Sequence, residues 1–239
     1  MKKSSITEIA KRTYNSKDYG NRSYSEWKWL RKPHTKSIYN QTKFSIESTL
    51  DRKGLNCLEI GIGDGIWTEL LLKREFNVDG IDISTRMLDM AKERLGNRIN
   101  YILADFNEVI LKNKYDLIYS IRCIEYIDDK KKAINKIYNL LNHSGKVIIV
   151  TKNPSFIAIK WQDRDMHKGQ IYSKDLKILM HEAGFKDIKV IPAVFGKGIH
   201  FAFIRKFNET ILKKLIKTKK DIFVLNPLIE SYLIIGEKK

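Results

Sequence analysis

Three glycines at alternate positions follow a short apolar run in the segment that most constrains this chain. The segment reads Cys57-Leu-Glu-Ile-Gly-Ile-Gly-Asp-Gly-Ile-Trp67, and its first apolar residues predict a buried strand. Residues 66–74 continue with a leucine-rich stretch that predicts the buried face of a helix. Glycines in such a turn let a ligand lie against bare backbone, and a helix N-terminus behind it offers unpaired N–H groups. The segment therefore predicts the start of a nucleotide-binding α/β unit.

The spacing of these glycines separates two ligand families. The dinucleotide site of an NAD-dependent oxidoreductase takes G-x-G-x-x-G/A, but the last position of that pattern falls on Ile66. The segment instead spells Glu59-x-Gly61-x-Gly63-x-Gly65, which resembles the first motif of the class I S-adenosylmethionine (SAM) methyltransferases. The resemblance implies a loop under the methionine half of SAM, with Glu59 helping to position it. A glycine turn in an unrelated α/β protein is the alternative.

An acid ends the second predicted strand, residues 77–83. A carboxylate at that tip, Asp82, accepts hydrogen bonds from both ribose hydroxyls of an adenosine. A helix with Ser84 as its N-cap is predicted to follow over residues 84–95. Asp82-Ile-Ser-x-x-Met87 is similar to the second motif of the same methyltransferase family. The resemblance implies that Asp82, Ile83 and Met87 contact SAM.

The resemblance also implies cofactor-binding residues at the C-terminal ends of the third and fourth predicted strands. Residues 100–106 form a strand ending in Asp105, which in the family holds the adenine amino group, while the backbone of Phe106 meets the ring edge. Residues 115–122 form the fourth strand, beginning with the Tyr-Asp pair common in the family. Its C-terminal end, residues 120–126, should face the sulfonium and the acceptor. Ser120 and Ile121 are therefore expected to contact the cofactor.

The later elements predict the rest of the sheet. We expect a helix over residues 130–141, a fifth strand over 146–151, a helix leading to a sixth strand over 186–191, and a seventh strand from Ser231. In the family the last strand inserts antiparallel between the fifth and sixth. The expected fold is α/β, with a doubly wound, seven-stranded, mostly parallel sheet. Residues 53–239 are predicted to form the SAM-binding domain, with insertions at about 155–171 and 193–230.

Residues 1–52 precede the first strand and are predicted to form a helical N-terminal extension. Their central stretch is rich in aromatic and cationic residues and has little periodicity. In the family such extensions usually fold over the SAM pocket as a lid, so Tyr24 and Trp27 are assigned to the cofactor site, with Tyr19 and His34 as further lid residues. A lid would exclude water from methyl transfer. Alternatively, these aromatics attach the extension to the body.

The insertion at residues 155–171 follows the fifth strand. Loops that leave strand C-termini line the ligand crevice of a parallel sheet, so this insertion supplies acceptor-site candidates. His167 is the predicted general base, because Asp163 or Asp165 could orient it, with Trp161 and Arg164 as further candidates. An ordinary surface histidine is the alternative.

A near match to another motif precedes this insertion. Asn153-Pro-Ser-Phe156 resembles the N/D/S-P-P-Y/F motif of base-methylating amino-methyltransferases, but those enzymes carry it after the fourth strand. This argues against base methylation.

The chain carries a formal net charge of +17, from 45 basic and 28 acidic residues. Such a surface attracts RNA, anionic lipids and phosphorylated substrates, although lysine enrichment in an AT-rich genome would produce the same balance. Residues 208–220 predict a basic amphipathic helix, which suggests peripheral membrane contact or an ordinary solvated face.

The remaining composition indicates a cytoplasmic protein. The first residues lack the apolar core of a signal peptide, and no apolar stretch approaches a membrane span. Cys57 and Cys123 have no metal-ligand spacing and suit a reducing compartment, and no metal site is expected.

These features predict a SAM-dependent methyltransferase that yields S-adenosylhomocysteine and methylates an oxygen or nitrogen of a small-molecule, glycan or lipid-precursor acceptor. Three alternatives are considered: an RNA or protein methyltransferase that docks through its basic surface, a non-catalytic SAM-binding subunit, and an NAD-dependent oxidoreductase. The oligomeric state is left open.

Overall fold

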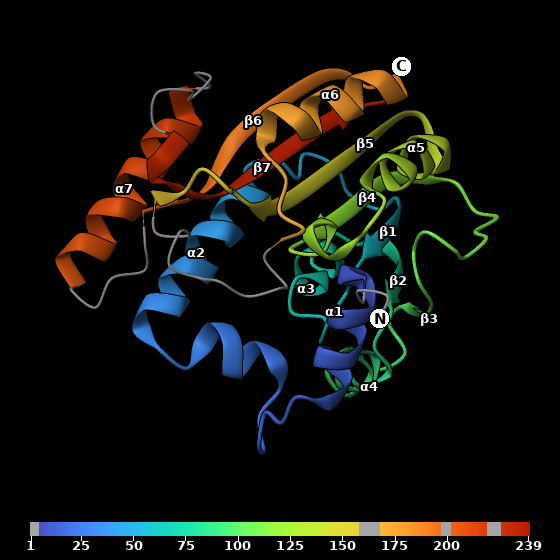
Figure 1. The fold of residues 1–239 in the computed structure, drawn as a ribbon, viewed down its shortest axis with the longest axis horizontal. Helices are drawn as coiled ribbons and strands as arrows, with labels where there is room; N and C mark the ends of the chain where they lie inside the picture. Colours follow the sequence, from blue (N-terminus) through green and yellow to red (C-terminus); the bar gives the residue numbers. More distant parts are fainter. Residues whose placement is uncertain (1–4, 158–167, 197–201, 219–225) are drawn as a thin grey trace.

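A computed structural model describes residues 5–157, 168–196, 202–218 and 226–239 (Figure 1). Its centre is a seven-stranded sheet in the order β3-β2-β1-β4-β5-β7-β6. The strands are β1 (Asn56–Ile60), β2 (Asn77–Asp82), β3 (Asn100–Leu103), β4 (Tyr115–Ile121), β5 (Leu141–Lys152), β6 (Lys186–Phe195) and β7 (Ile229–Glu237). Neighbouring strands are parallel except β7, which runs antiparallel to both β5 and β6. The predicted doubly wound α/β fold with an inserted last strand is confirmed.

Helices cover both faces of this sheet. They are α1 (Ile6–Ser16), α2 (Pro33–Glu47), α3 (Thr68–Leu72), α4 (Thr85–Leu95), α5 (Lys130–Leu140), α6 (Ser173–Ala183) and α7 (Ala202–Thr218), with short helical turns η1 (Glu26–Leu30), η2 (Ile124–Tyr126) and η5 (Asn226–Leu228). None of the helices in the described ranges is long and apolar enough to cross a membrane.

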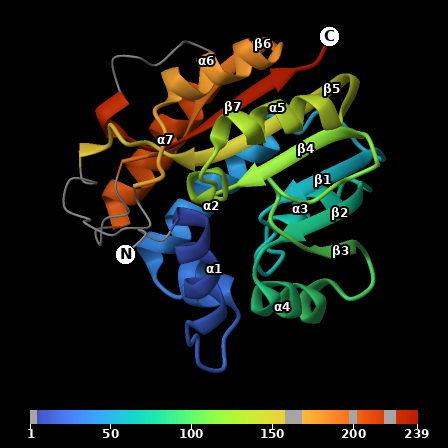
Figure 2. The same cartoon turned by 45° about the vertical axis from the view of Figure 1, so that its right-hand side comes forward.

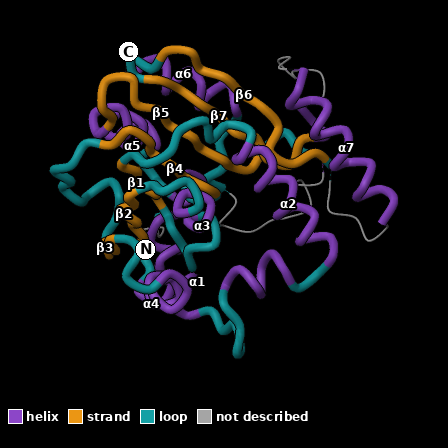
Figure 3. Tube along the Cα trace, turned by 180° about the vertical axis from the view of Figure 1, so that it is seen from behind, coloured by secondary structure: helices purple, strands orange, loops and turns teal. Residues whose placement is uncertain are grey.

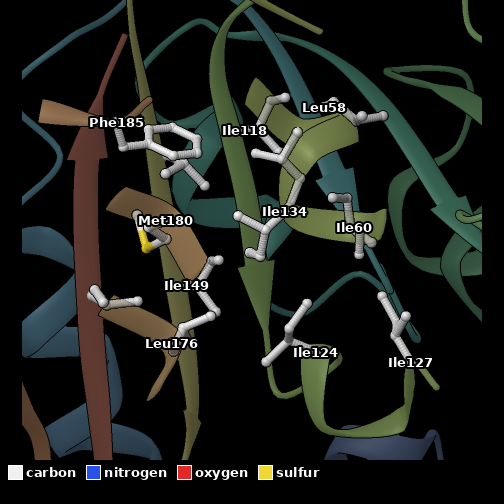
Figure 4. Packing of buried hydrophobic residues seen from close by; sticks show 14 of the residues in the cluster. Leu58, Ile60, Ile118, Ile124, Ile127, Ile134, Ile149, Leu176, Met180 and Phe185 are labelled. Atoms are coloured by element: carbon white, nitrogen blue, oxygen red, sulfur yellow. The ribbon is translucent and has the colours of Figure 1, made fainter. Parts of the chain in front are cut away.

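Alternation along the central strands explains the two-sided core. On one face Leu58 and Ile118 pack with Ile134 of α5 and Met180 of α6 (Figure 4). On the other face Cys57, Leu117 and Tyr119 pack with residues of α2 and α3. Successive side chains point to opposite faces, so a strand that is covered on both sides is apolar throughout. This is why the sequence of β4 is almost continuously apolar.

The N-terminal extension divides between two parts of the molecule. Figure 2 shows α1 beyond the arrowheads of β1 and β4 and close to α4, which it contacts. In contrast, α2 packs against β6 and runs beside α7 (Figure 3). Ser5 caps α1 by accepting the Glu8 N–H at 3.1 Å, and Ser84 caps α4 by accepting the Met87 N–H at 3.2 Å.

Several predicted boundaries were wrong. The helix after the glycine segment is only Thr68–Leu72, because the chain makes turns through residues 63–67 before it becomes helical. The sixth strand runs to Phe195, four residues past the predicted end, since Val194 and Phe195 still pair with β7. The insertion predicted at about 193–230 is therefore shorter at both ends. Its first residues belong to β6, and its last two residues belong to β7, which begins at Ile229.

Candidate functional site

A cavity lies where the carboxyl ends of β1, β2 and β4 meet the N-terminal extension. It contains about 880 Å³ of empty space, its open mouth included. Its walls come from the extension, the glycine segment, the tips of β2 and β4 and the turns after β3 and β4. The lining residues are Thr7, Ala10, Tyr14, Tyr24, Trp29, Ile60, Gly61, Ile62, Gly63, Asp64, Ile66, Trp67, Ile81, Asp82, Ile83, Met87, Ala104, Asp105, Phe106, Ile121, Arg122, Cys123, Tyr126 and Ile127.

The glycine segment needs its glycines for two different reasons. A Cβ on Gly61, which has φ of +73°, would lie 2.4 Å from both Cβ and Sγ of Cys123, so a side chain would force the two loops apart. A Cβ on Gly65 would lie 2.6 Å from Cδ1 of Leu95, so this glycine lets α4 pack closely against the turn. Gly61 therefore lets the glycine segment approach Cys123, and Gly65 lets it approach α4.

Asp82 lies at the tip of β2 and joins that strand to the glycine segment. Its Oδ2 accepts the Gly63 N–H at 2.9 Å, and its Oδ1 accepts the Ser84 N–H at 2.9 Å. Burial raises the pKa of this carboxyl, although both hydrogen bonds act to lower it. Asp105, one strand further, also lines the cavity and accepts the Asn107 N–H at 2.8 Å. The three predicted strand-tip anchors thus face one cavity.

Glu59 lies beneath the glycine segment and is 1% exposed. Its Oε2 accepts a hydrogen bond from the Thr68 hydroxyl at 2.7 Å, but Oε1 has no hydrogen-bond partner in the described part of the chain. Burial raises the pKa of this carboxyl to about 8, against the lowering effect of the Thr68 hydroxyl. Burial therefore favours the protonated form of Glu59 at neutral pH.

Three tyrosines form an aromatic wall on the side of the extension. Tyr14 lies edge-on to Tyr24 and to Tyr126, with ring centroids 5.7 Å and 5.8 Å apart. Burial raises the pKa of all three phenols, to about 12 for Tyr126. They remain neutral near pH 7, so they supply apolar surface and hydroxyl groups but no phenolate base.

One aromatic residue assigned to the cofactor site lies outside the cavity lining. Trp27 does not line the cavity but packs against Tyr19, with the Lys17 Nζ 3.9 Å from its ring centroid. Trp29 lines it instead and packs edge-on against Trp67 at 5.9 Å. Residues two positions apart on a helix face opposite sides, and η1 turns the second tryptophan inward.

The extension is attached to the glycine segment through Asp64 and Arg94. Asp64 Oδ2 accepts the Ser25 N–H at 2.7 Å and lies 3.2 Å from Arg94 Nη2. The same Nη2 donates to the hydroxyls of Ser25 at 2.6 Å and Ser23 at 3.1 Å. A single guanidinium thus links α4, the glycine segment and the extension.

A second attachment holds α1. The backbone N–H of Ile6 donates to Asp128 Oδ1 at 2.8 Å, and the Thr7 hydroxyl donates to the Tyr126 carbonyl at 2.9 Å. At the other end of the helix, Asn15 Oδ1 accepts the Ser84 hydroxyl at 2.9 Å. These contacts place α1 against the turns that follow β2 and β4.

The predicted cofactor residues fall into three groups. Those lining the cavity are Gly61, Gly63, Asp82, Ile83, Met87, Asp105, Phe106, Ile121 and Tyr24. Those supporting it from outside its lining are Glu59, Gly65 and Ser120, whereas Trp27 is turned away. The acceptor-site candidates Trp161, Asp163, Arg164, Asp165 and His167 lie outside the described residues.

Sequence reasoning missed Tyr14 and the Asp64–Arg94 link. Tyr14 lies in the predicted N-terminal extension, and Asp64 lies inside the glycine motif itself, so the sequence alone could have suggested both positions. The Asn153 side-chain amide donates to the Ile229 and Asn226 carbonyls, each at 2.9 Å, and so joins the end of β5 to the start of β7. Within the described ranges, no group of three or more His, Cys, Asp and Glu residues is placed to hold a metal.

Comparison with known proteins connects this geometry to one chemistry. A family model described as a methyltransferase domain matches residues 40–190. A malonyl-[acyl-carrier protein] O-methyltransferase of Ilyobacter polytropus is 33% identical over 199 residues, covering 72% of this chain and 74% of the relative. A ubiquinone biosynthesis O-methyltransferase of Coxiella burnetii is 31% identical over 118 residues, covering 47% of this chain and 50% of the relative.

Solved structures show the same fold. A SAM-dependent methyltransferase of Thermotoga maritima, described as a possible histamine N-methyltransferase, has a TM-score of 0.67 and 19% identity, covering 98% of this chain and 100% of that one. An N-methyltransferase of Bradyrhizobium japonicum in complex with S-adenosylhomocysteine has a TM-score of 0.66 and 14% identity, covering 98% and 99%.

Proposed function

Because this chain belongs to the SAM-dependent methyltransferases, we propose that it transfers the methyl group of SAM to an oxygen or nitrogen of a small-molecule, glycan or lipid-precursor acceptor. The observation that carries the proposal is that Gly61, Asp82 and Asp105, from three different strand tips, line one cavity together with the aromatic wall. Both curated relatives described above are named as O-methyltransferases, which favours oxygen as the accepting atom.

The residues present fit an adenosyl cofactor. A Cβ at Gly61 would collide with Cys123, so only bare backbone fits at this point of the lining, and within the described residues the buried Oε1 of Glu59 is left without a hydrogen-bond partner. Gly61 and Gly63 would lie against the methionine half, Asp82 would accept the ribose hydroxyls, and Asp105 with Phe106 would hold the adenine. The bound cofactor supplies a methyl group on a sulfonium, already activated for displacement. The protein then mainly has to align the accepting atom, an effect that can supply about 7–11 kcal/mol.

We further propose that residues 1–52 act as a lid over a domain formed by residues 53–239. Two observations support this role. The extension is attached to the domain through Asp128 and Arg94, and it contributes Tyr14, Tyr24 and Trp29 to the cavity wall. A closed lid excludes water from the transfer. Deleting residues 1–33 should weaken SAM binding and reduce turnover, whereas unchanged values for both would contradict the lid.

His167 remains the proposed general base for a hydroxyl acceptor. Removing such a base reduces turnover by about 10²–10⁴-fold. The matched control is His143, which is exposed among the first residues of β5, at the opposite end of the sheet from the cavity. If His167→Ala turns over within about twofold of His143→Ala, no base acts from this position.

The first experiment is calorimetry with SAM, S-adenosylhomocysteine and NAD. Binding of the two adenosyl ligands without NAD is expected, while binding of NAD alone would contradict the proposal. Radiolabelled SAM with panels of hydroxylated and amine-bearing acceptors then identifies the acceptor class. The two free cysteines, Cys57 and Cys123, agree with the cytoplasmic location that we propose.

The net charge of +17 supports a second candidate, an RNA or protein methyltransferase that docks through its basic surface. If the protein docks in this way, its affinity for tRNA should fall by several orders of magnitude when the salt concentration rises from about 50 to 200 mM. An absent or salt-insensitive interaction favours the small-molecule acceptor.

A further inference from the structure

Helix α7 lies beyond the β6 edge of the sheet, on the opposite side of the molecule from β3 (Figure 1). It contains residues 208–218 of the basic amphipathic helix predicted over 208–220, whose last two residues lie outside the described part of the chain. The inner face of α7 packs on the core, where Leu212 is 1% exposed and Ile211 and Leu215 lie against the same cluster. The side of this helix that the fold needs is therefore already covered.

Two contacts fix which face of α7 points outward. The Asn208 side chain lies against Gly196, just after β6, where a Cβ would be 2.4 Å from the Asn208 Nδ2. Glu209, the one acid in the sequence of α7, accepts the Ser37 hydroxyl of α2 at 2.8 Å. Both side chains are turned toward the body of the protein. The outer face of α7 therefore has a fixed orientation and carries no carboxylate.

The outer face of α7 combines exposed phenylalanines with lysines. Phe203 is 73% exposed and Phe207 is 61% exposed. Lys206, Lys214 and Lys217 are exposed as well, and none of the three forms an ion pair within the described ranges. Residues three, four or seven positions apart share one face of a helix, so these five side chains lie along one stripe. This outer stripe is both cationic and apolar.

A membrane surface with anionic lipids complements both properties of the outer stripe. Aromatic rings enter the boundary between head groups and acyl chains, while lysine ammonium groups stay at the level of the lipid phosphates. A single-stranded nucleic acid would also attract the lysines, but proteins hold it in a groove that follows its backbone. The outer stripe is instead the convex side of a helix at the edge of the molecule, which suits a flat surface.

We propose that the outer stripe of α7 docks this protein on a membrane surface that contains anionic lipids. Phe203 and Phe207 enter the head-group region, and the three lysines contact lipid phosphates. Each lysine near such a surface contributes about a fivefold gain in affinity. No residue of α7 belongs to the described lining of the cavity, so this inference concerns a separate surface and does not depend on the identity of the methyl acceptor.

The test is co-sedimentation of the full chain with lipid vesicles. One set contains phosphatidylcholine alone, and the other contains about one-third phosphatidylserine. We expect the anionic vesicles to bind about tenfold or more tightly at about 0.1 M salt, and this binding to weaken as salt rises. Equal binding to the two sets overturns the proposal. Absence of binding to the anionic vesicles overturns it as well, and tRNA that is bound in their place would identify a nucleic-acid surface.

Charge variants locate the docking surface. Lys214→Gln combined with Lys217→Gln should reduce the affinity for anionic vesicles about tenfold or more. The matched control combines Lys92→Gln in α4 with Lys112→Gln in the loop before β4, two exposed positions on the β3 side of the sheet. This control changes the net charge equally and should stay within about threefold of wild type. An equal loss of affinity in both double variants overturns the assignment to α7.

A second variant tests the apolar part of the stripe. Phe207→Ser should reduce the affinity for anionic vesicles about fivefold or more, because it removes an aromatic ring from the head-group region. Ile110→Ser, at a position that is 87% exposed in the loop before β4, is the control and should bind as wild type does. Unchanged affinity in Phe207→Ser contradicts insertion of the ring. All the replaced side chains are exposed, so thermal midpoints equal to that of wild type should show that the variants are folded.

Discussion

Replacing Glu59 by Gln should change how the stability of the cofactor-free protein depends on pH. The Glu59 carboxyl has a pKa of about 8 in the folded protein, compared with an ordinary value of 4.5. Below pH 4.5 the group is protonated in both the folded and the unfolded states. Between pH 4.5 and 8 the folded state keeps a proton that the unfolded state has lost, so the free energy of unfolding falls as pH rises. Above pH 8 this dependence ends.

The size of this effect follows from the two pKa values. At about 1.4 kcal/mol per pH unit, the interval from 4.5 to about 8 corresponds to about 5 kcal/mol of unfolding free energy, of which about 3 kcal/mol is lost by pH 7. Glutamine is neutral at every pH and has nearly the shape of the protonated acid. The Glu59→Gln protein should therefore match wild type in acid and become more stable than wild type as pH rises.

Urea unfolding of both proteins without cofactor, at about pH 5, 7 and 9, measures this difference. Glu93→Gln, at an exposed position of α4, is the matched control and should follow wild type throughout. If the free energies of unfolding of Glu59→Gln and wild type stay parallel from pH 5 to 9, the Glu59 carboxyl is not protonated in the folded protein and the reasoning fails.

Two further substitutions test the cavity floor and the attachment of the extension. Gly61→Ala should reduce the affinity for S-adenosylhomocysteine, measured by calorimetry, about tenfold or more, because its Cβ would lie 2.4 Å from Cys123. Gly54 has φ of +67° and open space around it, so Gly54→Ala is the control for backbone strain alone. Arg94→Met should lower the free energy of unfolding by about 2 kcal/mol in urea titrations, because it leaves the buried Asp64 carboxylate without its cation. Arg98→Met, at an exposed position, is the control, and an equal effect of the two substitutions would contradict this reasoning.

The strand tips could be predicted from the sequence because each carries its own local signal. Apolar runs place the strands; Asp82 is the last residue of β2, and Asp105 lies two residues beyond the end of β3. Parallel strands bring their carboxyl ends to one edge of the sheet, so these residues had to meet. The inserted seventh strand came from the family resemblance and not from periodicity.

The other wall of the site could not be predicted because it depends on long-range packing. Whether Trp27 or Trp29 faces the cavity is decided by the short helical turn η1, in a segment without hydrophobic periodicity. Arg122 reads as an ordinary residue after a strand, and its partners Glu125 and Glu230 come together only when β7 inserts into the sheet. The sequence leaves such pairings open until the topology is known.

The division of the N-terminal extension has a consequence for ligand exchange. Gln41 and Ser45 hold α2 to β6, since the Phe195 N–H donates to the Gln41 side chain at 3.0 Å and the Ser45 hydroxyl donates to the Ala193 carbonyl at 3.1 Å. A departing α1 would thus stay tethered, and the hinge would lie between residues 17 and 25, around Gly20 with φ of +61°. Movement of α1 away from the cavity would break the contacts of Ile6 with Asp128, of Thr7 with Tyr126 and of Asn15 with Ser84, while α2 keeps its place on β6.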